Sequence, residues 1–320
     1  MTSLTNLQVP CLTPTWHRVT SQADVLGESP FWQPAENRLY WLDIPGQRLR
    51  RLCIQDKLHA QGEVEDWTLP EEPGCFAPAA LGGWIMALRS GIYRAHEWGG
   101  PLTLLASAPY DTAHLRFNDG KCDPAGHFWG GSMYEPRDRA AGVLYAYQTG
   151  AGLQAKADQA TVANGLAWSP DGGSLYWSDT GAHRIRVWNY DAASMGLSNE
   201  RVLAQFPMKP KDWVWGTPEA SAYAGRPDGA TVDAQGFYYA AMYEGRRLAK
   251  IAPDGRVVAF IETPVQCPTM PCFGGDDLCT LFITTSAHGR SPQELQALPD
   301  SGCVFAMRVQ TPGLAVNFFK

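Results

Sequence analysis

Short hydrophobic runs separated by turn residues recur along the whole chain. Six of these runs have aromatic or aliphatic centres and occupy residues 39–43, 83–87, 127–131, 175–179, 237–241 and 281–285. Each is about as long as one β-strand, and turns rich in glycine and proline, such as 123–126 and 169–172, precede several of them. This pattern predicts a succession of β-hairpins with little helix.

The runs follow one another at a nearly constant distance. Their central residues are separated by 43, 45, 48, 62 and 44 residues, in the order Trp41, Trp84, Trp129, Trp177, Tyr239 and Ile283. A repeat of this length with about four short strands is typical of one blade of a β-propeller, whereas a β-sandwich would not require a regular period. The sequence therefore predicts an all-β fold, a six-bladed β-propeller with four-stranded blades around a central channel, as a single domain over residues 1–320.

Two segments fall outside the repeats. Residues 1–15 form an N-terminal extension, and an inserted loop at about 207–225 accounts for the long 62-residue step. The loop contains Trp213 and Trp215 and leads directly into Asp228. We expect it to line or cap one mouth of the channel; the alternative is a solvated excursion without a functional role.

Composition narrows the class of protein. Hydrophobic residues make up 45% of the chain, with 12 residues each of Trp, Tyr and Phe, so a sizeable core is expected. The net charge of −6 gives no electrostatic footprint for nucleic acid or an anionic membrane. The first ten residues lack the features of a secretory signal, which favours a cytoplasmic location, and the eight scattered cysteines are expected to be reduced thiols.

Oxygen-bearing side chains recur at like positions in four repeats. Glu28 and Asn164 each lie 13 residues before their repeat's central residue, and Asn118 and Asp228 each lie 11 residues before theirs. In a propeller these positions meet at one entrance of the channel. An Asx-Gly pair alone is more typical of a turn, but carboxylate and amide oxygens together suit a hard cation such as Ca²⁺ or Mg²⁺. The shared position therefore favours one common site.

Several motifs carry a family resemblance. They are Leu-Gly-Glu-Ser-Pro at 26–30, Arg-Phe-Asn-Asp-Gly-Lys at 116–121, Asn-Gly-Leu-Ala-Trp-Ser-Pro-Asp-Gly at 164–172, Pro-Asp-Gly at 227–229 and Pro-Cys-Phe-Gly-Gly at 271–275. In order and spacing, from about residue 17 to about 310, the chain resembles the senescence-marker/gluconolactonase (regucalcin-like) family, of the bacterial sugar-lactonase type.

The resemblance implies a metal-dependent lactonase that acts on a small sugar lactone. It implies one divalent cation held by Glu28, Asn164 and Asp228, with Ca²⁺ the first expectation and Zn²⁺, Mg²⁺ or Mn²⁺ as alternatives. It also implies substrate contacts from Arg116 and Asn118. Where many members have an acidic pair, this chain has Tyr-Glu-Pro at 134–136, so Glu135 is a less regular candidate for a substrate contact.

These residue types fit lactone ring opening, which needs a polarised carbonyl and an activated water. A metal ion supplies both effects, and Asp228 is the candidate general base. Arg116 offers a planar fork of donors for hydroxyl groups or a developing oxyanion. Asp119 is expected to point away from Asn118 on an extended strand and to act as a turn or supporting residue.

Two other functions remain open at this stage. The same site could hydrolyse phosphotriesters or bulkier lactones, or the protein could be a non-enzymatic calcium-binding propeller. Serine-hydrolase and zinc-protease schemes have no support, because the chain contains neither Gly-x-Ser-x-Gly nor His-Glu-x-x-His. Arg116 and Asn118 favour the enzyme, since a purely structural ion would not require them.

Overall fold

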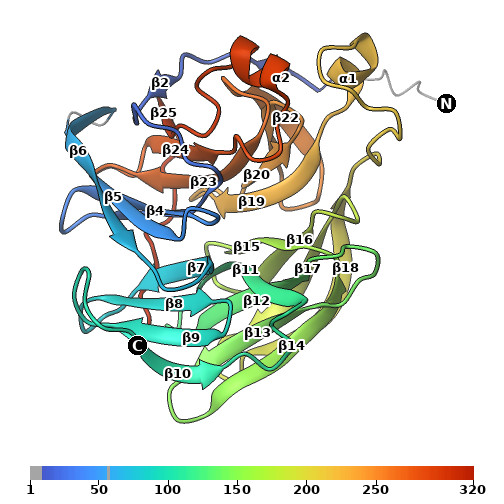
Figure 1. Ribbon diagram of the computed structural model, residues 1–320. Helices are drawn as coiled ribbons and strands as arrows, with labels where there is room; N and C mark the ends of the chain where they lie inside the picture. The colour runs from blue at the N-terminus through green and yellow to red at the C-terminus, as the bar shows by residue number, and fades with distance from the viewer. Residues whose placement is uncertain (1–8, 56–57) are drawn as a thin grey trace.

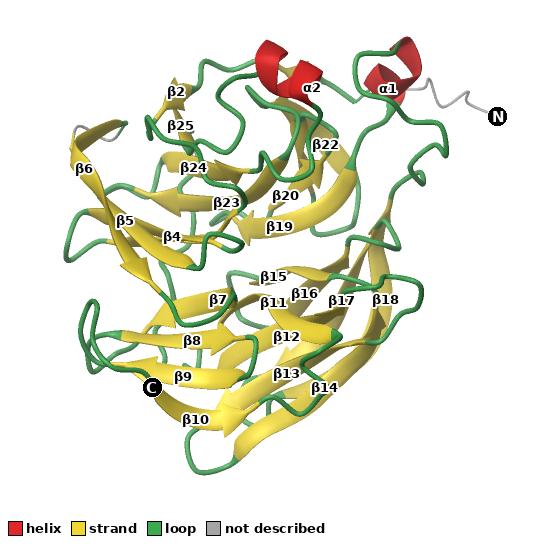
Figure 2. Cartoon of the chain, viewed as in Figure 1, coloured by secondary structure: helices red, strands yellow, loops and turns green. Residues whose placement is uncertain are grey.

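The structure is a computed structural model that describes residues 9–55 and 58–320. The described residues form 25 strands and two short helices, and the strands are arranged in six sheets (Figures 1 and 2). Within each of the six sheets, consecutive strands pair antiparallel as in a β-meander. The predicted six-bladed β-propeller is confirmed.

The first three blades each contain four consecutive strands. Blade 1 is β3 (Gly27–Gln33), β4 (Arg38–Asp43), β5 (Arg48–Gln55) and β6 (His59–Thr68). Blade 2 is β7 (Pro73–Pro78), β8 (Trp84–Leu88), β9 (Gly91–Ala95) and β10 (Thr103–Ser107). Blade 3 is β11 (Leu115–Cys122), β12 (Phe128–Tyr134), β13 (Gly142–Gln148) and β14 (Gly152–Ala160).

Of the last three blades, blade 4 again contains four consecutive strands, whereas blades 5 and 6 each take up one strand from the N-terminal part of the chain. Blade 4 is β15 (Ala163–Trp168), β16 (Ser174–Asp179), β17 (Arg184–Asp191) and β18 (Gly196–Gln205). Blade 5 is β19 (Arg226–Val232), β20 (Tyr238–Tyr243), β21 (Arg247–Ile251) and β22 (Val257–Glu262), with β1 (Cys11–Leu12) added in parallel to β22. Blade 6 is β23 (Pro268–Gly274), β24 (Thr280–Thr285), β25 (Phe305–Arg308) and β2 (His17–Arg18).

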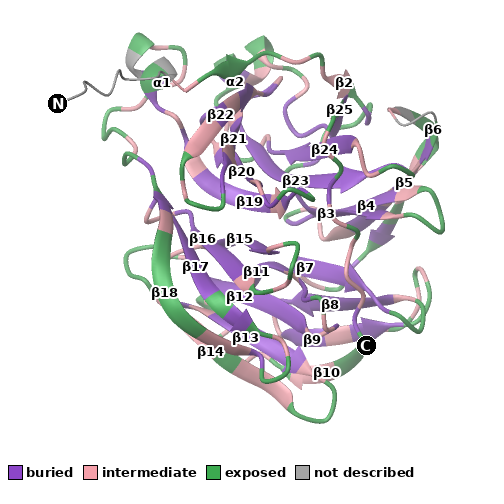
Figure 3. Cartoon of the chain, turned by 180° about the vertical axis from the view of Figure 1, so that it is seen from behind, coloured by how far each residue is buried: buried purple, intermediate pink, exposed green. Residues whose placement is uncertain are grey.

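The six hydrophobic runs of the sequence coincide with the second strands of the blades: β4, β8, β12, β16, β20 and β24. Their central tryptophans Trp41, Trp129 and Trp177 are among the largest fully buried side chains. They pack between neighbouring sheets, which explains why each repeat keeps a large apolar residue at this position. Figure 3 shows the same gradient, with buried inner strands and exposed positions on the outer strands β14 and β18.

The innermost strands close a ring around the central axis. β3, β7, β11, β15, β19 and β23 contact one another in that order, and β23 contacts β3 again. Figure 1 shows several of these strands gathered around the centre of the molecule. Blade 6 joins the two ends of the chain, because β2 pairs with β25 through His17 and Ala306.

The residues after β25 cross the end of the ring where the innermost strands finish. We call residues 309–320 the C-terminal strap. Its backbone bonds to blade 6 at Leu278 and to blade 5 at Ala234, then to blade 2 at Pro78 and blade 3 at Gly126 (N···O 2.9–3.0 Å). The strap therefore ties together blades that are far apart in the ring.

The inserted loop lies between β18 and β19 and contains α1 (Pro218–Ala222), while α2 (Pro292–Ala297) follows β24. Residues 1–8 of the expected N-terminal extension lie outside the described residues. All eight cysteines are free thiols. Among the described residues, neither helix is long and apolar enough to cross a membrane.

Candidate active site

The four oxygen-bearing residues found by spacing lie near the starts of four innermost strands. They are Glu28 on β3, Asn118 on β11, Asn164 on β15 and Asp228 on β19. At each of them the register with the second strand shifts, between Glu28 and Phe31, Phe117 and Gly120, Asn164 and Ala167, and Pro227 and Ala230. A β-bulge of this kind redirects side chains out of the regular alternation. The same local irregularity is therefore repeated at one end of four blades.

A glycine makes the bulge of β15 possible. Gly165 follows Asn164 and has φ +60°, in the left-handed region that side chains rarely adopt. A Cβ atom here would also collide with the hydroxyl groups of Tyr238 and Ser178. Tyr238 instead donates a hydrogen bond to the Gly165 carbonyl (2.6 Å), which locks the bulge in place.

Hydrogen bonds connect Arg116, Asn118 and Asn164 in one row. Arg116 Nη1 donates to Asn118 Oδ1, and Asn118 Nδ2 donates to Asn164 Oδ1, each at 3.0 Å. Asn164 Nδ2 in turn donates to the Thr180 hydroxyl at 2.8 Å. All three members of the row are buried. The orientation of both amides is thus fixed from Arg116 at one end and Thr180 at the other.

Glu28 and Asp228 are buried carboxyl groups, each 7% exposed, that influence one another. Burial raises the pKa of Glu28 well above its usual range, and the charges of Asp228 and Asp119 raise it further. Burial also raises the pKa of Asp228, while Arg226 and a hydrogen bond with Asn164 oppose that rise. Neither carboxyl group forms a salt bridge with a described residue, so their negative charge is not compensated by a close cationic side chain.

This donor set fits a hard divalent cation. Two carboxylates and one amide oxygen match the preferences of Ca²⁺ and Mg²⁺, and a bound cation would relieve the repulsion between Glu28 and Asp228. No cluster of three or more His, Cys, Asp or Glu side chains in residues 9–55 and 58–320 is arranged as a metal site. The candidate ligand set has only two carboxylates and depends on Asn164 for its third oxygen.

The Asp119 side chain lies near Glu28 and Asp228, whereas the sequence predicted that it would point away from the site. It is 4% exposed, its Oδ2 accepts from the Leu166 amide at 2.9 Å, and its Oδ1 lacks a hydrogen-bond partner among the described residues. Its charge raises the pKa of both Glu28 and Asp228. The bulge in β11 explains the difference, because it breaks the strict alternation from which the expectation was derived.

Arg116 and Glu135 meet at the rim of the same end of the channel. Arg116 Nε lies 3.6 Å from Glu135 Oε1, and burial lowers the pKa of this guanidinium. Arg89 holds both oxygens of Glu135 at 2.9 and 3.0 Å, and this pairing lowers the pKa of Glu135. Glu135 thus stands beside the predicted substrate contact Arg116 and is itself engaged by two arginines.

The inserted loop is attached beside Asp228. Lys209 Nζ lies 2.8 Å from Glu244 Oε2, and Arg226, two residues before Asp228, lies 3.1 Å from the same oxygen. The Trp213 ring packs against Lys209 and also faces Arg290. Trp215 instead donates to Gln266 (3.2 Å) and lines a hollow with Cys11 of β1. Trp213 is therefore the tryptophan nearer the site, and Trp215 lies toward the outer edge of blade 5.

A cavity of about 350 Å³ occupies the opposite end of the channel. Its walls are mostly apolar and include Phe31, Phe76, Trp168 and Val316 of the C-terminal strap. Lys121 reaches this cavity and donates to the Ala230 carbonyl. We place the candidate active site at the other end, because Glu28, Asn164 and Asp228 converge there with Arg116.

Comparison with known proteins identifies a matching family profile and several relatives of this chain. Residues 26–287 match the profile described as SMP-30/Gluconolactonase/LRE-like region. The chain is 43% identical to a 6-deoxy-6-sulfogluconolactonase of Pseudomonas putida over 94% of this chain and 97% of that protein. It is 30% identical to regucalcin of Danio rerio, over 90% and 92% of the two chains. The crystal structure of a calcium-binding protein, regucalcin from Agrobacterium tumefaciens, shares the fold with a TM-score of 0.86 at 23% identity, covering 98% and 100% of the two chains.

Proposed function

Because the chain belongs to the SMP-30/gluconolactonase/LRE-like family, we propose that it hydrolyses the lactone of an aldonic acid. The site is the one formed by Glu28, Asn118, Asn164 and Asp228. The observation that carries this proposal is the pair of buried carboxyl groups, Glu28 and Asp228, which influence one another and lack a salt bridge among the described residues.

In the proposed reaction, a water oxygen adds to the lactone carbonyl carbon and the bond between that carbon and the ring oxygen breaks. The ring oxygen leaves as a hydroxyl group of the open-chain product. The new carboxylic acid group releases a proton to give the aldonate. The water must lose a proton as it attacks, so a general base near the carbonyl accelerates the reaction.

Asp228 is the candidate base. Without a cation, burial raises the pKa of Asp228 to about 8, and a cation bound beside it would favour the ionised carboxylate that can accept a proton. Arg116 would donate hydrogen bonds to substrate oxygens, and its contacts with Asn118 and Glu135 support this role because they orient its guanidinium. Asn118 would offer its Oδ1 as an acceptor to the same substrate, because its Nδ2 already donates to the Ala163 carbonyl and to Asn164.

Glu28, Asn164 and Asp228 would hold the divalent cation that the calcium-binding regucalcin relative suggests. When bound, such a cation supplies a Lewis acid for the carbonyl and lowers the pKa of a coordinated water. Glu28 lies on a different blade from Asp228, so the ion would also bridge β3 and β19.

The test is a substrate panel assayed with purified protein after chelation and after addition of Ca²⁺, Mg²⁺, Mn²⁺ or Zn²⁺. We expect ring opening of pentono- and hexonolactones, including 6-deoxy-6-sulfogluconolactone, only with added metal. Asp228→Asn should lower kcat/KM by at least about 100-fold, as expected for loss of a general base. Hydrolysis at the full rate in metal-free protein would contradict the mechanism, and metal binding with no hydrolysis of any lactone would favour a non-enzymatic calcium-binding role.

A further inference from the structure

Arg89 joins blades 2 and 3 at the rim of the candidate active site. It follows β8 directly, in the turn to β9, and its backbone amide donates to the Glu72 carbonyl at 3.0 Å. Its Nε and Nη2 donate to Glu72 Oε2, and its Nη1 donates to the Thr112 carbonyl at 3.0 Å, just before β11. These contacts fix the guanidinium between the two blades.

Glu135 is the carboxylate that Arg89 shares with Arg116. Arg89 Nη1 donates to Glu135 Oε2 at 2.9 Å and Arg89 Nη2 donates to Oε1 at 3.0 Å, so the pair is bidentate. The Glu135 backbone is held as well, because its amide donates to the His114 carbonyl at 2.9 Å. Arg116 Nε lies 3.6 Å from Oε1, which is beyond the reach of a hydrogen bond. Arg89 therefore occupies the carboxylate that is nearest to the Arg116 guanidinium in these ion pairs.

Arg116 keeps donors that the protein does not use. Its Nη1 donates to the Phe117 carbonyl at 2.9 Å and to Asn118 Oδ1 at 3.0 Å. Its Nε and Nη2 form no hydrogen bond with a residue in 9–55 or 58–320. A guanidinium has five N–H donors in a planar fork, so most of this fork remains open to a ligand.

We propose that Arg89 is a positioning residue: by holding both oxygens of Glu135, it prevents this carboxylate from closing on Arg116 and leaves the Arg116 donors to the lactone. This inference rests on the proposed lactonase function. Without Arg89, a movement of about 0.7 Å would shorten the 3.6 Å separation to an ordinary hydrogen bond of about 2.9 Å. A carboxylate is a stronger acceptor than the neutral oxygens of a lactone, so Glu135 would then compete with the substrate for Arg116.

The experiment is a double-mutant cycle in the metal-loaded protein, with kcat and KM measured on the panel of pentono- and hexonolactones. Arg89→Met should raise KM by about tenfold and change kcat by less than about threefold, because the lost interaction is one of substrate binding. Adding Glu135→Gln to Arg89→Met should lower KM again, to within about threefold of the unchanged protein, since a neutral amide holds Arg116 less strongly. A merely structural role of Arg89 would not produce this recovery.

A second variant and a control accompany the cycle. Arg89→Lys keeps the charge but loses the planar fork, so KM should rise by about threefold; this variant carries the test where Arg89→Met does not fold. Arg308→Met is the matched control. Arg308 holds both oxygens of Asp277 (3.1 and 2.6 Å), but it directly precedes the C-terminal strap, at the end opposite the candidate active site. Its removal should change KM by less than about twofold, and thermal unfolding checks that each variant is folded.

The results separate this inference from the proposed function. Lactone hydrolysis with an unchanged KM in folded Arg89→Met overturns the inference and leaves the lactonase function standing. A double variant with a KM as high as that of Arg89→Met also overturns it, because Glu135 would then not be the group that blocks Arg116. The same rise of KM in Arg308→Met overturns it as an effect of overall charge. Failure of the unchanged protein to hydrolyse any lactone overturns the proposed function and this inference together.

Discussion

At the scale of single residues, blade 1 contains one buried carboxyl group that is paired with an arginine and one that is not. Asp24 and Arg50 are 2% and 1% exposed, and they form a direct salt bridge that Trp41 supports with a 2.8 Å hydrogen bond to Asp24. Glu28, four residues after Asp24, is nearly as buried but has no salt bridge among the described residues. The Asp24–Arg50 pair compensates its own charge and has a structural role. The Glu28 carboxyl group has no cationic side chain as its partner among the described residues, so it is available to a bound ion.

The structural pair gives a prediction about stability. Arg50→Met removes the partner of Asp24 and should lower the free energy of unfolding by about 3–5 kcal/mol, because it leaves a buried charge uncompensated. Arg51→Met is the control, since Arg51 pairs with the half-exposed Glu65 on the other face of β5 and should cost less than about 1 kcal/mol. Denaturant unfolding of both variants measures the difference, and equal losses would contradict the assigned role.

The same variant should show a defined pH dependence. Burial raises the pKa of Asp24 from its ordinary 3.8 to about 6 even with Arg50 present, and losing Arg50 should raise it further. A carboxyl group whose pKa is raised in the folded state makes the protein less stable as the pH rises from the unfolded pKa to the folded pKa. The reason is that the unfolded chain releases the proton more readily. The deficit of Arg50→Met should therefore be larger at pH 8 than at pH 5. A deficit that is larger at pH 5 would contradict this assignment.

The sequence predicted where Glu28, Asn118, Asn164 and Asp228 lie because each occupies a fixed place in a repeat. It did not predict that Asp119 joins them, since the inference assumed regular alternation and the bulge in β11 breaks it. Gly120 was the available signal: a Cβ there would collide with the Trp129 carbonyl, so the residue marks a close approach of two strands.

At the scale of elements, the second strand of each blade was predictable because its large apolar residues recur with the blade. The strands β1 and β2 were not, because each is two residues long and gains its partners only from blades 5 and 6, more than 200 residues away. The inserted loop lies between β18 and β19, and its attachment depends on Glu244, which has φ +62° and binds Lys209 from the loop. No local pattern encodes that contact.

The inserted loop gives a prediction about specificity. Trp213→Ala should change the relative kcat/KM among lactones by about fivefold, equivalent to roughly 1 kcal/mol, because its ring packs on Lys209 and Arg290 beside the mouth. Trp215→Ala is the control, since that ring faces Gln266 at the outer edge of blade 5. Steady-state kinetics on the lactone panel measure both. The same change of ranking in the two variants would contradict a role for Trp213 in substrate choice.

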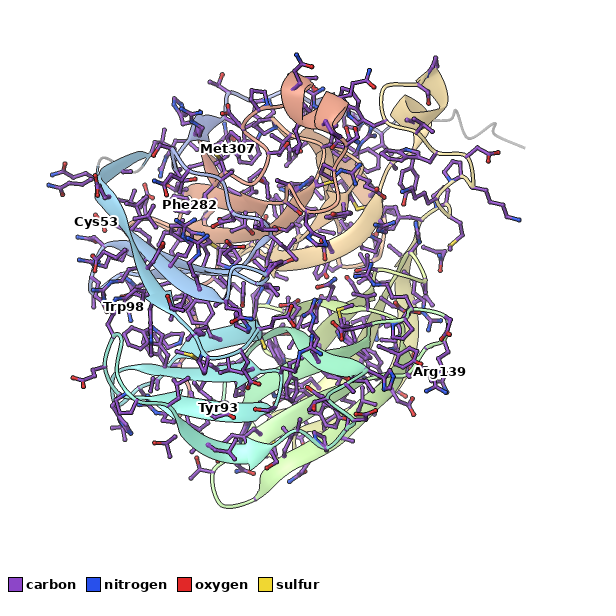
Figure 4. All side chains as sticks on the ribbon, viewed as in Figure 1. Cys53, Tyr93, Trp98, Arg139, Phe282 and Met307 are labelled. Carbon is purple, nitrogen blue, oxygen red and sulfur yellow. The ribbon has the colours of Figure 1, made fainter. Side chains whose placement is uncertain are left out.

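At the scale of the whole molecule, the candidate active site and the C-terminal strap lie at opposite ends of the ring. Charged groups gather where the innermost strands begin, and the C-terminal strap covers the end where they finish, over an apolar cavity. Phe282, labelled in Figure 4, is a fully buried side chain of β24 that packs in the core between blades 6 and 1. A change at the strap should therefore act on stability and leave the reaction unaffected.

Phe319 tests this separation. Its ring is 8% exposed, lies 5.9 Å from the ring of Tyr147, and packs with the core of blades 2 and 3. Phe319→Ala should lower the free energy of unfolding by about 3 kcal/mol, as expected for a large-to-small change at a buried aromatic residue. Leu81→Ala on the neighbouring loop should change it by less than about 0.5 kcal/mol, because Leu81 is 96% exposed. We expect kcat/KM of both variants, measured well below the unfolding temperature, to match that of the unchanged protein. A selective loss of activity in Phe319→Ala under those conditions would mean that the two ends of the channel are coupled, since Phe319 belongs to the C-terminal strap at the end opposite the candidate active site.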